Sequence, residues 1–257
     1  SFDQEDGGDG FASRLITTIS IILFVLVAVG MYFAPALVRL YAPEFFTTGF
    51  EVEKEIAIAF TRYCLPQIFF LGLFTMLGQV ANARGSFAPL MWAPIANNIV
   101  GIALFGAFLV FSPSVSIDNI SNIQVQILGW GTTLSVVVQA LILVPVIKRL
   151  GITLRPQWGV KGLGKSFGLA GWTLIYVLIS QLGYLVTVNV ATSAAVRSAQ
   201  EGIERGVGYT PYTFAYYVML LPYSIVTISI ITAILPHISR LALEKKAEEV
   251  REQLIRA

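Results

Sequence analysis

Six long stretches of this 257-residue chain contain no charged side chain, and they constrain the fold more than any other feature. They cover residues 15–38, 63–83, 85–117, 119–147, 166–196 and 206–239. Each is long enough for a helix to cross a bilayer, which takes about 20 apolar residues. Since 56% of the residues are hydrophobic and only 12% are charged, the composition excludes an ordinary soluble domain. We therefore predict an all-α, polytopic integral membrane protein.

The apolar runs are too long for the strands of a membrane barrel, which alternate over about ten residues. We predict six transmembrane helices, at 13–41, 55–83, 88–112, 124–150, 167–196 and 211–241. With six spans, both ends lie on the same side of the membrane. That side holds 12 of the 17 Lys and Arg residues and the other side holds 5. Because positively charged loops stay inside, both ends are predicted to be cytoplasmic.

The connection at 151–165 differs from the other loops, with four glycines, one proline and three basic residues. We interpret it as a basic cytoplasmic linker between two groups of helices. Residues 1–150 are then part of a first lobe with four spans, and residues 166–257 begin a second lobe with two. The mixed charges of 242–257 predict a helical tail that continues into the cytoplasm. The acidic, glycine-rich start resembles an interhelical loop, so we expect a fragment.

Several kinds of chemistry are not supported by the sequence. It contains no HExxH, GxSxG or Walker motif, and the six charge-free spans contain no carboxylate. One cysteine, Cys64, excludes an intrachain disulfide, and one histidine, His237, cannot form a histidine-based metal site. The net charge of +2 is small and the bases are scattered, which argues against nucleic-acid binding. We expect no enzymatic activity, no metal and no cofactor.

Prolines and polar side chains within the spans are the candidate functional features. Pro66 and Pro222 are predicted to kink their helices around a cavity. At 100° per residue, polar side chains form one stripe within about 80° on each of the last two spans. The stripes are Thr173, Tyr176, Ser180, Tyr184 and Thr187, then Tyr212, Tyr216, Tyr223 and Thr227. They predict a shared wet cavity; the alternative is a tyrosine-rich packing seam with aromatic residues at the membrane interface.

Three segments carry a resemblance to a known family. They are RYCLPQIFF at 62–70, GQVANARGSFAPLMWAPIANNIV at 78–100, and AYYVMLLP at 215–222 followed by ILP. The chain resembles the MurJ/MviN family of lipid II flippases, within the multidrug/oligosaccharidyl-lipid/polysaccharide exporter superfamily. The resemblance runs through nearly the whole chain and corresponds to helices three to eight of fourteen.

The resemblance implies a function and a site. The function is alternating access by two six-helix lobes, which carries the undecaprenyl-diphosphate-linked peptidoglycan precursor, lipid II, across the bacterial cytoplasmic membrane. The last two spans here would line a cationic cavity. Where relatives typically read ADRLxxFP, this chain reads AYYVMLLP, so Tyr217 holds the position of the cavity arginine and Tyr216 that of the acid. A phenol can donate a hydrogen bond to a diphosphate but lacks the charge and two-pronged geometry of a guanidinium.

The leading hypothesis is a lipid II flippase surrounded by membrane lipids. We predict that its substrate-binding cavity is lined by Ser180, Gln181, Tyr184, Tyr216, Tyr217 and Tyr223. Arg84 is either a positive-inside anchor or a first contact for an anionic head group at the cytoplasmic mouth. Two alternatives remain: a drug or polysaccharide exporter of the same superfamily, and a membrane scaffold that recruits cell-wall synthesis enzymes.

Overall fold

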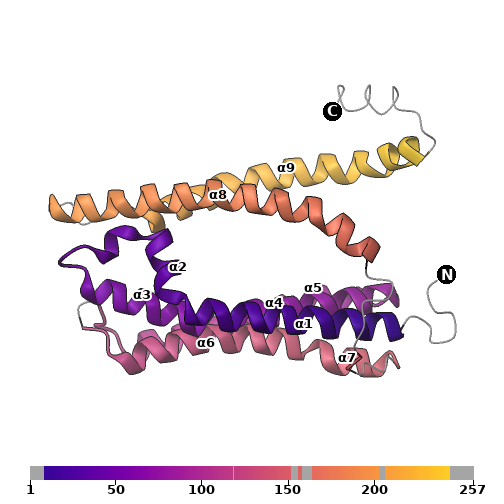
Figure 1. Cartoon of the computed structure of the whole chain (residues 1–257), viewed down its shortest axis with the longest axis horizontal. Helices are drawn as coiled ribbons and strands as arrows, with labels where there is room; N and C mark the ends of the chain where they lie inside the picture. The colour runs from indigo at the N-terminus through magenta and orange to yellow at the C-terminus, as the bar shows by residue number, and fades with distance from the viewer. Residues whose placement is uncertain (1–8, 118, 152–155, 158–163, 203–205, 244–257) are drawn as a thin grey trace. The chain divides into compact units, whose positions relative to one another are not determined.

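The computed structural model describes residues 9–117, 119–151, 156–157, 164–202 and 206–243, and these residues are almost entirely helical (Figure 1). The described side chains exclude those of residues 9, 164–170, 228 and 231–243. The elements are α1 (Asp9–Tyr32), α2 (Ala34–Tyr41), η2 (Pro43–Phe46), α3 (Glu51–Cys64), α4 (Pro66–Ala83), α5 (Ala88–Phe111), α6 (Asn122–Leu141), α7 (Leu143–Arg149), α8 (Gly164–Gln200) and α9 (Tyr209–Leu243). The all-α prediction is confirmed.

Five stretches of helix are long and apolar enough to cross a membrane: Gly10–Tyr32, Glu51–Ala83, Ala88–Phe111, Asn122–Arg149 and Gly171–Gln200. They correspond to the first five predicted spans. The sixth predicted span lies in α9, where many side chains are outside the described set, and it stays a prediction. The chain is therefore a polytopic membrane protein.

Prolines set where the long apolar runs are broken. The first run divides into α1 and α2 just before Pro35, and the second divides into α3 and α4 at Leu65, directly before Pro66. The fourth divides at Ile142, three residues before Pro145. A proline has no N–H to donate, and its ring clashes with the preceding turn, which explains a break on its N-terminal side. By contrast, α9 continues as one helix through Pro222.

The helix α6 begins at Asn122, two residues before the predicted start of this span, because its first turn is capped. Ser121 caps this helix, because its hydroxyl accepts a hydrogen bond from the backbone N–H of Gln124. The Gln124 side chain accepts one in return from the Ser121 N–H, at 2.8 Å. This reciprocal capping satisfies two N–H groups that would otherwise have no partner and fixes the start of the helix at Asn122.

By their internal contacts the residues divide into two units, Ser1–Asn189 and Val190–Ala257. Within the first, α1, α4, α5 and α6 run side by side (Figure 1), and α7 packs against α4. The buried centre consists of Leu77 and Ala81 from α4 with Leu143 and Ile147 from α7. The predicted lobe boundary at 151–165 falls mostly outside the described residues, as does the predicted tail beyond 243, so both stay predictions.

A polar cluster joins the Pro66 break to α6. The Thr133 hydroxyl donates to the Tyr63 carbonyl at 2.6 Å, in the last turn of α3. The Gln67 amide, in the first turn of α4, donates to the hydroxyls of Thr132 and Thr133 at 3.2 and 3.3 Å. Both halves of the broken helix are thereby tied to the same turn of α6. Since Thr133 is only 3% exposed, water cannot replace these bonds.

Replacing Thr133 by valine should lower the free energy of unfolding by about 1–3 kcal/mol, because the Tyr63 carbonyl and Gln67 amide lose a partner in a buried place. The change keeps the shape of the side chain, so packing loss contributes little. The unfolding midpoint in detergent measures the effect. Thr75→Val is the control, since the exposed Thr75 hydroxyl bonds only to Leu71 in its own helix. Equal midpoints for the two variants would show that the cluster is not stabilising.

Candidate functional site

The predicted polar stripe on α8 is exposed over most of its length. Ser180 and Gln181 are both exposed, and Tyr176 and Tyr184 are 71% and 46% exposed. Thr187 is half-buried and bonds to the Gly183 carbonyl of its own helix. A polar side chain that faces lipid leaves its donors and acceptors unsatisfied. The stripe therefore favours a neighbouring helix or a water-filled space over bare lipid.

One end of this stripe contacts the end of α2. The rings of Tyr184 and Tyr41 lie edge to face, with their centroids 6.4 Å apart. The Asn189 amide donates to the Leu40 carbonyl at 2.9 Å. That carbonyl lies in the last turn of α2, where no later N–H of the helix can reach it, so Asn189 caps α2 from another helix. The ring contact and hydrogen bond are together worth about 1–3 kcal/mol.

The second stripe begins with a series of tyrosines on α9. Tyr209 and Tyr212 have ring centroids 6.4 Å apart, and Tyr212 and Tyr216 stack at 6.3 Å with an interplanar angle of 17°. Residues four apart lie on one helix face, so the stacking follows from their spacing. Tyr216 also contacts Tyr217 at 6.2 Å, which links this face to the adjacent one. Tyr223 is farther along and is 61% exposed.

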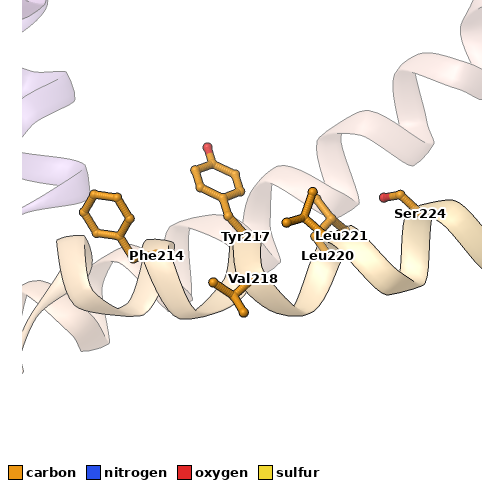
Figure 2. A pocket seen from close by; sticks show the side chains of 6 residues that line it. All are labelled: Phe214, Tyr217, Val218, Leu220, Leu221 and Ser224. Carbon is orange, nitrogen blue, oxygen red and sulfur yellow. The ribbon is translucent and has the colours of Figure 1, made fainter.

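Tyr217 lies on that adjacent face, in a shallow hollow of about 310 Å³ (Figure 2). Phe214 and Tyr217 stand on the same side of the helix, and the Tyr217 and Ser224 hydroxyls are the polar groups among the labelled side chains. The other lining residues are Val218, Leu220 and Leu221. The surface of this hollow is almost entirely apolar, which suits a hydrocarbon chain.

The NARG segment forms the turn after α4. The Ser86 N–H bonds to the Ala81 carbonyl at 3.0 Å, and the Gly85 N–H bonds to the Asn82 carbonyl at 2.9 Å. Gly85 has φ of 77°, which residues with a Cβ rarely adopt, and this accounts for a glycine directly after Arg84. Arg84 caps α4, and its residue is exposed. The turn holds the Arg84 side chain at the end of α4, where its positive charge can attract an anionic head group.

The structure thus places the predicted substrate-binding residues on α8, on α9 and, for Arg84, at the end of α4. Ser180, Gln181 and Tyr184 lie on α8, and Tyr184 contacts α2. On α9, Tyr217 lines the hollow while Tyr216 and Tyr223 belong to the neighbouring stripe. Pro66 lies at a helix break and Pro222 within a continuous helix, and their functional role stays a prediction. Sequence reasoning did not identify the Leu40 carbonyl or Tyr41, because only tertiary structure brings them to α8.

The family described as "Lipid II flippase MurJ" matches residues 2–257. The "Lipid II flippase MurJ" of Burkholderia cenocepacia is 24% identical over 257 residues, which cover 96% of this chain and 46% of that protein. The "Probable lipid II flippase MurJ" of Vibrio cholerae is 25% identical over 238 residues, covering 89% and 41%. The chain spans less than half the length of these curated relatives.

The long apolar helices define a multi-pass membrane protein. Because the family match covers residues 2–257, the chain belongs to the MurJ lipid II flippase family. The resemblance seen in the sequence is therefore confirmed. The family consists of transporters, so the chain is not an enzyme.

Proposed function

We propose that this chain forms part of a lipid II flippase that works by alternating access in the bacterial cytoplasmic membrane. The match of the MurJ family over residues 2–257 carries the proposal. The polar stripes on α8 and α9 support it, because a carrier of a diphosphate head group needs hydrogen-bond donors inside a membrane. Both ends of the chain lie in the cytoplasm in this proposal, and 151–165 joins the two lobes.

The head group meets a sequence of donors in this proposal. Arg84 supplies the first positive charge at the cytoplasmic mouth. Ser180, Gln181 and Tyr184 from α8 and Tyr216, Tyr217 and Tyr223 from α9 then supply hydroxyl and amide donors within the cavity. Since Tyr217 stands where relatives have an arginine, helix α9 contributes hydrogen bonds to the diphosphate rather than charge.

Complementation tests the proposal. The protein to be tested is the family-length protein, in which these 257 residues are joined to the other helices that family members have. It is expressed in cells from which the host's lipid II flippase is depleted, and growth is recorded. Recovery of growth is expected. Failure to grow despite confirmed membrane insertion would contradict the proposed substrate.

The same cells distinguish the alternatives. A scaffold that recruits cell-wall synthesis proteins should tolerate changes in the cavity but fail when residues 244–257 and any later ones are deleted. A flippase should show the reverse pattern. A drug or polysaccharide exporter should show efflux stimulated by its own substrate and no rescue of growth after flippase depletion.

A further inference from the structure

Two contacts join α8 to the end of α2, and we propose that they are an outer latch: a contact that closes the outer mouth of the transport path and must break in each cycle. The latch is the Asn189 amide on the Leu40 carbonyl together with the Tyr184 ring on the Tyr41 ring. This inference rests on the proposed flippase function and on the predicted membrane orientation.

The four residues of the latch come from two different predicted lobes. Leu40 and Tyr41 precede the linker at 151–165 and belong to the predicted first lobe. Tyr184 and Asn189 follow the linker and belong to the second. The helix α2 ends at Tyr41, on the side predicted to be outside. A contact between lobes on that side closes the outer mouth, and alternating access requires such a contact to open.

The latch is built to break reversibly. Leu40 is 53% and Tyr184 is 46% exposed, so neither side chain is locked in a packed interior. The Asn189 amide also donates to the Leu185 carbonyl of its own helix, at 3.2 Å. When the latch opens, the amide therefore keeps a partner, and the Leu40 carbonyl at the end of α2 is released to water. Neither group has to be buried unsatisfied in the open state.

The cluster around Thr133, in the same unit, differs from the latch because it is buried. Its hydroxyls lie between α3, α4 and α6, all in the predicted first lobe, and Thr133 is buried. Opening that cluster would leave the Tyr63 carbonyl and the Gln67 amide without partners away from water. The Thr133 cluster is therefore a contact within one lobe that persists through the cycle. The α2–α8 contact is one between lobes that breaks and forms again.

Reversible cross-linking tests the latch in the family-length protein. Cys64 is the only cysteine of the 257 residues and is replaced by alanine, together with any cysteine in the remaining helices. Leu40→Cys and Asn189→Cys are then introduced together and joined by a short thiol cross-linker that a reductant cleaves. Lipid II exposure at the outer face is measured in flippase-depleted cells before cross-linking, after it, and after reduction.

A second pair of cysteines, both within the predicted first lobe, serves as the control for cross-linking. Phe24 of α1 and Phe69 of α4 have ring centroids 6.5 Å apart, close to the 6.4 Å of Tyr41 and Tyr184. Cysteines at 24 and 69 should cross-link without blocking transport, because neither helix moves relative to the other in the cycle.

The latch predicts at least a tenfold loss of lipid II exposure when the 40–189 pair is cross-linked, with recovery on reduction. Equal exposure in the cross-linked and reduced states would overturn it, as would failure of both the 40–189 and the 41–189 pairs to cross-link when the control pair does. If the reduced 40–189 protein is inactive, cysteines at 41 and 189 give the same comparison against their own reduced state, because Tyr41 adjoins the Leu40 carbonyl that Asn189 contacts. If the cysteine-free protein itself exposes no lipid II, the proposed function fails, while the gel-measured cross-linking yield still tests the contact.

Discussion

Replacing Gly129 by alanine should separate α3 from α6 and lower the free energy of unfolding by about 1–3 kcal/mol, the cost typical of overpacking a close contact. A Cβ added at Gly129 would lie 2.7 Å from the Cβ of Tyr63 and 2.9 Å from its Cδ2. The Tyr63 Cβ is fixed to the backbone and cannot turn away, so the helices must move apart. That movement would also stretch the 2.6 Å bond from Thr133 to the Tyr63 carbonyl.

Gly101→Ala is the matched control for this variant. Gly101 also lies inside a long helix, α5, but a Cβ there meets no atom within 4 Å. Since alanine favours a helix over glycine, this change should raise stability by up to about 1 kcal/mol. The two variants should therefore differ by about 1–4 kcal/mol in unfolding experiments in detergent. A similar stability for both would show that the close approach at Gly129 is not part of the folded packing.

Replacing Tyr217 by glutamate should reduce lipid II exposure by the family-length protein more than tenfold. The hollow on α9 would then present a negative charge to an anionic diphosphate, and like charges repel strongly where water is scarce. Tyr217→Phe removes only the hydroxyl. Because a hydrogen bond to a charged group is worth about 1.5–3 kcal/mol, that variant should lose about tenfold or more in head-group affinity.

Tyr209→Phe controls for the loss of a tyrosine hydroxyl on the same helix. Tyr209 begins α9 and does not line the hollow that contains Tyr217. Its replacement should leave lipid II exposure close to the parent value, and transport by the three variants is compared at equal amounts of protein in the membrane. Full transport by Tyr217→Glu would exclude Tyr217 from the path of the head group and leave the α8 residues as the candidate contacts.

The arrangement of spans could be predicted because charge acts locally. A charged residue is costly inside a bilayer, so the charge-free runs mark the helices. Five of the predicted spans match helices of the structure for this reason. The start of α6 was placed two residues late because capping by Ser121 and Gln124 is not visible in an apolar pattern.

The partners of the polar side chains could not be predicted in the same way. Helical periodicity places Tyr184 and Gln67 on a face, but it does not say which residue lies opposite. Asn189 and Leu40 are 149 residues apart in the chain, and only folding brings them together. Similarly, adjacent positions such as Tyr216 and Tyr217 point to different faces of α9, so a shared motif does not place them at one site.

The proposed movement of lipid II across the membrane is tested most directly by the amount of lipid II at the outer face. The family-length protein is expressed in cells depleted of their own flippase, and lipid II accessible to an externally added, membrane-impermeant enzyme is quantified. Restoration of outer lipid II to the level of undepleted cells is the predicted result. Lipid II that stays inaccessible, with the protein confirmed in the membrane, would contradict the account and favour the exporter or scaffold alternatives.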